Sequence, residues 1–333
     1  MAADMADQPR VLASCIERWD VSAELIRAAV PRPLRGIVLV ARGSSDNAAL
    51  YGRYLLELAT GLPVSMAAPS LITLYRGRLQ CRDHLVVAAS QSGRTPEIQQ
   101  VVEELRAEGA HALALTNDGN SPLAASADMV VELGAGEERA IPATKTVIAE
   151  LVSFALLGGA LGVVPWSRDD LAGIPAAAES VLGDRDPARR LAERLSGERE
   201  LAVVARGFLY CAAKEAALKL KEAARLVAEA YSAADFRHGP IALVGELPVL
   251  ALHVRGAARP DVMALIRGLR RREVRIFEAS DRPGADLPLP RVAEALAPIL
   301  AVLRSQQLAL ELALARELDP DLPPWLRKVT RTR

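Results

Sequence analysis

The amino-acid sequence predicts an α/β protein made of two tandem halves, each a parallel β-sheet covered by helices on both faces. Short, continuous apolar runs alternate with helical stretches, which is typical of parallel strands buried on both sides. This alternation occurs twice, before and after a charged segment at 166–198 that also contains Pro and Gly. The length of 333 residues fits two domains of about 150 residues each.

The first half begins with apolar positions at helical spacing, which end before a turn that contains Pro31 and Pro33. Four apolar runs follow, and we expect them to be the strands of the first sheet. The predicted strands are residues 37–41, 84–89, 111–115 and 129–133, and the predicted helices are residues 46–60, residues 96–108 and a helix from about residue 144.

The second half repeats this order. The predicted strands are residues 201–205, 248–254 and 274–279, and the predicted helices are residues 210–229 and about 293–317. Its first strand (VVARG at 203–207) resembles that of the first half (LVARG at 39–43), which together with the strand–helix order favours a duplication. We expect an N-terminal helix within 1–30, domains at 31–165 and 199–317, a connection at 166–198 and a C-terminal tail at 318–333.

The composition restricts the classes of partner. Basic and acidic residues are equal at 41 each and form no basic block, so nucleic acid is not an expected partner. Cys15, Cys81 and Cys211 share neither a metal-ligand spacing nor a disulfide framework, which indicates a reducing compartment. The N-terminus lacks a signal-peptide pattern, and the most apolar stretch, at 151–166, is short for a membrane span. We expect a cytoplasmic protein with no membrane partner.

The most informative local motif is SQSGRTPE at 90–97, which follows a predicted strand and begins a helix. Free backbone N–H groups and the positive helix end converge at such a turn and bind anions. Ser90, Ser92 and Thr95 add hydroxyls and Gln91 adds an amide, while Gly93 allows close approach of the backbone. An ordinary helix cap is the alternative, although three hydroxyls and one amide in six residues favour an anion site.

A second turn of the same kind, RGSSD at 42–46, follows the first predicted strand and contains Ser44 and Ser45. Ligands of open α/β sheets bind beyond the carboxyl ends of the strands, where two such turns can face one ligand. By itself this turn is equally typical of a simple helix start. Paired with the motif at 90–97, it supports one anion-binding site formed by both turns.

Two further motifs are in the second half. Glu215, Lys219 and Glu222 recur at i, i+4 and i+7, so they share one face of a helix, and a solvated ladder of ion pairs is the alternative explanation. His238 lies in a loop, DFRHGP at 235–240, whereas the other three histidines lie at or in predicted strands. A histidine in a Gly-Pro turn can serve in acid–base chemistry, although a lone loop histidine is often without function.

Together these motifs resemble the SIS-domain amino-sugar phosphate enzymes, which include the isomerase half of glutamine–fructose-6-phosphate aminotransferase and stand-alone glucosamine-6-phosphate deaminases. The resemblance implies two tandem SIS domains, each a three-layer αβα, flavodoxin-like fold. The first would bind the sugar phosphate, and the second would carry the catalytic helix and the histidine loop. The segments that carry the resemblance are residues 42–45, 90–95, 143–145, 215–222, 228–231, 236–240 and 328–330.

The resemblance also implies roles for individual residues. Glu222 would move the proton between C1 and C2, His238 would help to open the sugar ring from a neighbouring subunit, and Lys328 would close over the sugar. A homodimer with shared sites is therefore expected, with a phosphorylated amino sugar as substrate and with no cofactor or metal. The residues implied to contact the substrate are Ser44, Ser45, Ser90, Gln91, Ser92, Thr95, Ala143 and Lys219.

The sequence departs from the family pattern in two places. It contains no glutaminase half, so we do not expect ammonia to come from glutamine. The synthases typically carry Val-Ala-Ser-Thr-Lys where residues 141–145 read Ile-Pro-Ala-Thr-Lys, so one sugar-contacting hydroxyl is missing at Ala143. The ending KVTRT at 328–332 is closer to the deaminases.

Three hypotheses for function follow. The first is an isomerase/deaminase that converts glucosamine 6-phosphate into fructose 6-phosphate and ammonia. The second is an N-acetylglucosamine-6-phosphate dehydratase, in which the same C2 deprotonation expels the C3 hydroxyl. The third is a non-catalytic sugar-phosphate sensor, which the joint presence of Glu222, His238 and Lys328 disfavours.

Overall fold

The chain folds into two compact units in a computed structural model that describes residues 1–243, 245 and 247–328. The first unit contains residues 10–138, 145–164 and the described residues from 326 onward. The second unit contains residues 1–9, 139–144 and 165–325. Both units are therefore discontinuous in sequence, and the predicted tail at 318–333 includes residues 329–333, which lie outside the described residues.

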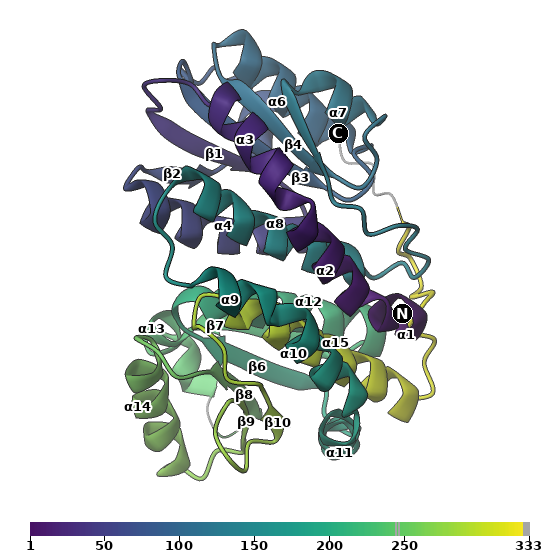
Figure 1. The fold of residues 1–333 in the computed structure, drawn as a ribbon. Coiled ribbons are helices and arrows are strands. Elements are labelled where there is room, and N and C mark those ends of the chain that lie inside the picture. The colour runs from purple at the N-terminus through teal and green to yellow at the C-terminus, as the bar shows by residue number, and fades with distance from the viewer. Residues whose placement is uncertain (244, 246, 329–333) are drawn as a thin grey trace. The chain divides into compact units, whose positions relative to one another are not determined.

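The first unit is built on a five-stranded, fully parallel sheet in the order β2-β1-β3-β4-β5 (Figure 1). All four predicted strands are confirmed, and the additional strand β2 at the edge is only three residues long. The strands are β1 (Gly36–Val40), β2 (Val64–Met66), β3 (His84–Ser90), β4 (His111–Thr116) and β5 (Met129–Glu132).

Helices cover both faces of this sheet because successive side chains of a strand point to opposite sides. Val38, Val86 and Ala112 face a core formed with α5 and α6, while α4 and α8 pack together on the other face (Figure 1). The helices of this unit are α2 (Gln8–Glu17, which begins in the second unit), α3 (Trp19–Ala29), α4 (Ser44–Thr60), α5 (Pro69–Thr73), α6 (Pro96–Ala107), α7 (Pro122–Ser126) and α8 (Lys145–Leu161).

The second unit has a five-stranded parallel sheet in the order β10-β9-β8-β6-β7. When its strands are numbered in chain order, both sheets follow 2-1-3-4-5, the order of flavodoxin-like folds. This shared topology agrees with the duplication predicted from the repeated first strand. The strands are β6 (Glu200–Ala205), β7 (Val227–Ser232), β8 (Val249–His253), β9 (Ile276–Ser280) and β10 (Leu287–Pro288).

Helices α13 and α14 cover one face of the second sheet, and α12, which packs against α15, covers the other. Residues 166–198, predicted as a connection, form three helices, two of which pack against α15. The helices are α1 (Ala2–Ala6), α9 (Arg168–Ala172), α10 (Ile174–Gly183), α11 (Asp186–Leu195), α12 (Tyr210–Ala224), α13 (Ala233–Phe236), α14 (Arg259–Arg270) and α15 (Ala297–Ala315).

The helix predicted over 210–229 is wrong at its C-terminal end. Arg225 adopts a left-handed backbone conformation with φ of 51°, and the N–H of Leu226 donates to the carbonyl oxygen of Leu220. This geometry ends α12 at Ala224. The chain then enters β7, so Glu229 and Tyr231 lie on a strand and not on the helix that carries Glu222.

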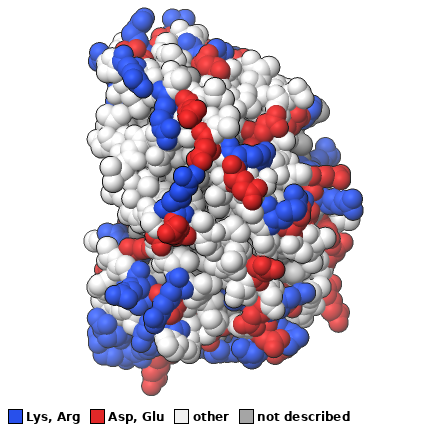
Figure 2. All heavy atoms as spheres, in the orientation of Figure 1, with Lys and Arg blue, Asp and Glu red and all other residues white. Residues whose placement is uncertain are grey.

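The surface carries both signs of charge. On the face drawn in Figure 2, Lys and Arg side chains are interspersed with Asp and Glu side chains. In the described part of the chain, no helix combines the length and the apolar character that crossing a membrane requires.

Candidate active site

The two hydroxyl-rich turns both lie at the point where the first sheet reverses its strand order. β1 and β3 are neighbours, and they continue into α4 and α6 on opposite faces of the sheet. In open α/β sheets this switch point forms a crevice at the carboxyl ends of the strands, where ligands bind. The Arg42 guanidinium ties the turns together, because its Nε and Nη2 donate to the Glu97 carboxylate at 3.0 and 2.9 Å.

The turn after β3 has the geometry of an anion-binding helix start. Ser90 is the last residue of β3, Thr95 is the N-cap of α6, and Pro96 follows it. Gly93 has φ of +60°, and a Cβ there would lie 2.1 Å from Ser121 Oγ. Only glycine fits this position, so the backbone of the Ser90–Thr95 turn can approach a bound oxyanion at the start of α6.

The turn after β1 places Ser45 against a buried carboxylate. Its hydroxyl donates to Glu150 Oε1 at 2.7 Å, and both residues are buried. A hydroxyl that donates to a carboxylate keeps its lone pairs for another partner. Ser45 is therefore arranged to accept a hydrogen bond from a ligand hydroxyl, while Ser44 at the first position of α4 is also buried.

A cavity of about 200 Å³ lies at this edge of the first sheet. It brings together three predicted residues, Gln91, Ser92 and Lys328. The sequence interpretation gave no role to the other residues that line it, namely Arg94, Asn117, Asp118, Gly136, Glu137 and Glu138.

The polar side chains around this cavity are held in place by one another. Arg94 Nη2 donates to Asp118 Oδ2 at 2.9 Å. The pKa of Asp118 lies below its usual value, because the backbone N–H of Asn120 donates to its carboxylate and Arg94 adds a further hydrogen bond and positive charge. Asn117 Nδ2 donates to the Gly136 carbonyl oxygen at 2.7 Å. The cavity wall is therefore pre-ordered and bears both signs of charge.

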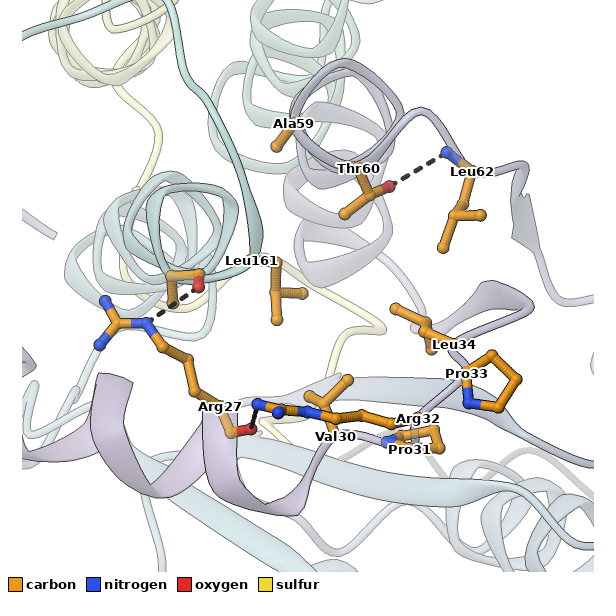
Figure 3. Close-up of a pocket in the computed structure, with 11 residues that line it drawn as sticks. Arg27, Val30, Pro31, Arg32, Pro33, Leu34, Ala59, Thr60, Leu62 and Leu161 are labelled. Atoms are coloured by element: carbon orange, nitrogen blue, oxygen red, sulfur yellow. Dashed lines mark hydrogen bonds between the residues drawn. The ribbon is translucent and has the colours of Figure 1, made fainter.

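A larger cavity of about 460 Å³ lies at the opposite edge of the same sheet (Figure 3). Leu34 and Leu62, which line it, precede β1 and β2. Its polar groups bond to the protein itself, since Arg27 Nε donates to the Ala160 carbonyl oxygen at 3.1 Å and Arg32 donates to the Arg27 carbonyl oxygen at 3.3 Å (Figure 3). No Asp, Glu or His lines this cavity. It therefore lacks the groups for acid–base chemistry.

In the second unit, the carboxylate and ammonium groups of α12 are buried together. Lys219 is fully buried and lies 3.5 Å from Glu215 Oε1 and within hydrogen-bond distance of Glu222 Oε2. The Glu215 side chain is 1% exposed and that of Glu222 is 21% exposed. The alternative of a solvated ion-pair ladder is therefore wrong. Burial of such charges is costly, and Glu222 is the carboxylate of this face that solvent or a ligand can reach.

His238 lies in an exposed position on an anchored loop. The guanidinium of the preceding residue, Arg237, donates to the carbonyl oxygens of Ala233 at 3.0 Å and Asp261 at 2.8 Å, and pairs with the Asp261 carboxylate at 2.9 Å. The loop backbone is thereby fixed, while the imidazole of His238 is accessible from outside the chain. Ala143 is partly exposed in the segment 139–144.

The predicted residues fall into two groups. Those of the two turns and Lys328 belong to the first unit, and Ala143, Lys219, Glu222 and His238 belong to the second. Among the described residues, no group of three or more His, Cys, Asp or Glu side chains is arranged to hold a metal ion.

The turn after β8 in the second sheet corresponds to the one after β3, and its anion site is already filled. Both turns have five residues between strand and helix, with a glycine in third place. The N–H groups of Ala257 and Ala258 donate to the two carboxylate oxygens of Glu294 at 2.8 and 3.0 Å. A Cβ on Gly256 would lie 2.1 Å from Glu294 Cδ. The first sheet is therefore the candidate for binding an external phosphate.

We expect Glu294→Ala to destabilise the protein by about 2–3 kcal/mol, because it leaves two amides without their carboxylate partner and removes one negative charge from beside a cluster of guanidinium groups. Repulsion from Arg255, Arg282 and Arg291 already contributes to a lowered pKa of Arg259, for which burial is the largest cause. Urea unfolding measures the loss, and Glu179→Ala, at an exposed position of α10, is the control. Added sulfate should raise the free energy of unfolding of Glu294→Ala more than that of Glu179→Ala. Equal stability of the two variants would contradict the assignment.

The chain was compared with known families and structures. A model of the SIS domain family matches residues 33–158 and 194–283. Glutamine–fructose-6-phosphate aminotransferase [isomerizing] of Symbiobacterium thermophilum is 33% identical, over 98% of this chain and 58% of that protein. The chain thus spans somewhat more than half the length of this relative.

Two solved structures resemble both units. A candidate phosphosugar isomerase from Silicibacter pomeroyi DSS-3 superposes with a TM-score of 0.85 at 29% identity, over 96% of this chain and 99% of that one. Glucosamine-6-phosphate deaminase from Thermotoga maritima superposes with a TM-score of 0.80 at 23% identity, over 99% of both chains. At this identity the comparison shows that the two chains share a fold. With the family match over both sheets and the hydroxyl-rich turns at the first switch point, the chain belongs to the SIS domain family.

Proposed function

We propose that this protein is an amino-sugar-phosphate isomerase that deaminates glucosamine 6-phosphate, giving fructose 6-phosphate and ammonia. The observation that carries the proposal is the Ser90–Thr95 turn at the switch point, beside a cavity that also contains Lys328. A helix start lined by hydroxyls and an amide suits a phosphate dianion. The similarity to an isomerizing aminotransferase over 98% of this chain supports an amino sugar as the rest of the ligand.

The proposed reaction begins with ring opening, assisted by His238, which exposes the C1 aldehyde. The hydrogen on C2 is then acidic because it is next to the carbonyl, and the Glu222 carboxylate removes it as general base. Return of that proton to C1, together with the transfer of one amine proton to the C1 oxygen, converts the C1 aldehyde into an alcohol and the C2 amine into an imine. Water hydrolyses the imine to the C2 ketone and releases ammonia, so glucosamine 6-phosphate and water give fructose 6-phosphate and ammonia.

Removal of the C2 proton requires a general base whose carboxylate is held in one orientation. The contact of Glu222 with the fully buried Lys219 limits the rotamers of its carboxylate, while 21% of its side chain is exposed to a ligand. Lys219 is in turn held by Glu215 one helical turn earlier. This arrangement supports Glu222, rather than Glu215, as the residue that contacts the sugar, because the Glu215 side chain is only 1% exposed.

A dehydratase acting on N-acetylglucosamine 6-phosphate is the second candidate, favoured by Ala143. A residue without a hydroxyl leaves space and removes a hydrogen-bond partner where the family's synthases contact the sugar. With an amide on C2, an imine does not form readily. The C2 carbanion would then expel the C3 hydroxyl and yield an unsaturated sugar.

One comparison tests the proposal. The purified protein is incubated with glucosamine 6-phosphate and with N-acetylglucosamine 6-phosphate, and ammonia, fructose 6-phosphate and ultraviolet absorbance are recorded. Ammonia and fructose 6-phosphate in equal amounts from the first substrate support deamination. Absorbance of an unsaturated product from the second substrate would instead support the dehydratase. Binding of either compound without turnover would identify a sensor and refute both enzymes.

We further propose a cytoplasmic homodimer in which His238 serves the site of the neighbouring subunit. The exposed position of His238 on an anchored loop supports this arrangement. A mixture of Glu222→Gln and His238→Ala subunits should then recover about a quarter of wild-type activity, because half of the dimers are mixed and each of these has one intact site. If His238 serves its own subunit, the mixture stays as inactive as either variant alone.

A further inference from the structure

A buried carboxylate that the sequence did not single out lies within the candidate site of the first unit. The side chain of Glu138 has no exposed surface. Its Oε2 accepts a hydrogen bond from Gln91 Nε2 at 2.6 Å and lies 3.5 Å from Lys328 Nζ. Gln91 is expected to contact the substrate and Lys328 to close over the sugar, so one carboxylate contacts both of these residues.

Glu138 is itself anchored by the start of α8. The backbone N–H of Thr146 donates to Oε1 at 3.3 Å, and the Thr146 hydroxyl donates to Oε2 at 2.9 Å. Thr146 is the second residue of α8, where the backbone N–H has no partner inside the helix and the helix dipole favours a negative charge. The position of the carboxylate is therefore set by a rigid helix and not by the substrate.

The charge of Glu138 also determines how Gln91 is oriented. An ionised carboxylate only accepts hydrogen bonds, so the Gln91 amide must turn its NH₂ group towards Glu138. The amide then keeps one N–H and its carbonyl oxygen for other partners. A neutral residue at position 138 would remove this constraint, because a carboxamide can both donate and accept.

The same carboxylate holds the C-terminal segment at the cavity. Lys328 belongs to the first unit only through the segment that begins at residue 326, whereas the residues from 165 to 325 belong to the second. The Lys328 side chain is 32% exposed, and Glu138 at the cavity wall provides a counter-charge for its ammonium group. A lysine kept beside Gln91 before substrate arrives needs less ordering on binding.

We propose that Glu138 is a positioning residue that orients the Gln91 amide and holds Lys328 at the substrate cavity. This inference adds a residue to the proposed function, and the kinetic part of the test below rests on that function. The role is to prepare two ligand-binding groups, and Glu138 takes no part in moving a proton.

Glu138→Gln tests the proposal with two readouts. Chemical acylation of lysines, followed by mass spectrometry of the folded protein, should show labelling of Lys328 that rises about fivefold, as expected from the loss of an ion pair. Labelling of Lys221, which pairs with Glu229 at 3.1 Å in the second unit, should stay constant. On glucosamine 6-phosphate, kcat/KM should fall about 100-fold, the cost of misplaced binding groups.

Glu104→Gln is the matched control, since it makes the same chemical change at an exposed position of α6. Thr146→Val is a second variant that keeps the charge of Glu138 but removes one anchor, and it should lower kcat/KM less than Glu138→Gln does. This variant separates positioning from a general loss of stability, which urea unfolding of both variants measures.

The proposal is overturned if Glu138→Gln and Glu104→Gln show the same Lys328 labelling. A rise in labelling with unchanged kcat/KM would also overturn it, because the effect on Gln91 would then be missing. If no amino-sugar phosphate is turned over by the wild-type protein, the proposed function fails. Lys328 labelling, which needs no turnover, would still test the contact with Glu138.

Discussion

Glu222→Gln is expected to bind glucosamine 6-phosphate with nearly unchanged affinity and to lose turnover by about 1000-fold or more, the size of a general-base contribution. The carboxamide has almost the same shape as the carboxylate, and its oxygen can still accept a hydrogen bond from the buried Lys219. It cannot accept the C2 proton. The expected losses are therefore in kcat and in exchange of the C2 hydrogen with deuterated solvent, measured beside the Kd from titration calorimetry.

The control for this variant is Glu229→Gln. Glu229 also belongs to the motif that suggested the family, but it lies exposed on β7, where it pairs with Lys221. This variant should keep both turnover and solvent exchange. A Glu222→Gln enzyme that still exchanges the C2 hydrogen at the wild-type rate would show that another group is the base.

Gly93→Ala should weaken phosphosugar binding by at least about 100-fold, the change expected when several hydrogen bonds to the phosphate are lost. The added Cβ would lie 2.1 Å from Ser121 Oγ and 2.9 Å from Thr116 Oγ1, so the turn has to move. The φ of +60° at this position adds strain of about 1–2 kcal/mol for any residue with a Cβ. Titration with glucosamine 6-phosphate and urea unfolding measure the two effects separately.

Gly61→Ala separates conformational strain from the clash. Gly61 ends α4 with φ of +68°, and a Cβ there would meet no atom within 4 Å. This variant should lose about 1 kcal/mol of stability and bind the phosphosugar as the wild type does. Equal binding by Gly93→Ala and Gly61→Ala would contradict the placement of the phosphate at the Ser90–Thr95 turn.

Most of the strands that were predicted correctly are buried on both faces, because such burial requires a continuous apolar run. β1, β3 and β4 are examples in the first sheet, and β6 and β8 in the second. β5 is an exception, since only Val131 of that strand is buried. β2 and β10 have three and two residues, which is too short for a pattern to be recognised.

The first three residues of β7 were predicted as the end of a helix, because the segment VAEAYS includes alanine and glutamate, which favour helices. Its burial alternates only in part, as expected for a strand at the edge of the sheet. Pairing with β6 over six residues, from Glu200–Val227 to Ala205–Ser232, outweighs this local preference. Such pairing is a tertiary interaction and is not encoded in the segment itself.

At the candidate site, the sequence alone was sufficient to locate the groups whose geometry depends only on neighbouring residues in the chain. A strand, a turn rich in hydroxyls and a helix start follow one another in the chain, so the Ser90–Thr95 motif predicted its own geometry. The face formed by Glu215, Lys219 and Glu222 follows in the same way from helical periodicity. Whether that face is wet or buried was open, because periodicity does not report what packs against a helix.

Contacts between residues that are far apart in the sequence could be identified only from the tertiary structure. Ser45 bonds to Glu150, 105 residues away, and Lys328 pairs with Glu138, 190 residues away. Ala257 and Ala258 bond to Glu294, which closes the turn of the second sheet. The carboxylates of Glu150 and Glu138 are buried, and that of Glu294 is partly buried, where distant elements meet. The energy of a hydrogen bond or ion pair depends on that burial. Local patterns thus determined which residues are candidates for binding a phosphosugar, and packing determined which carboxylates contact these residues.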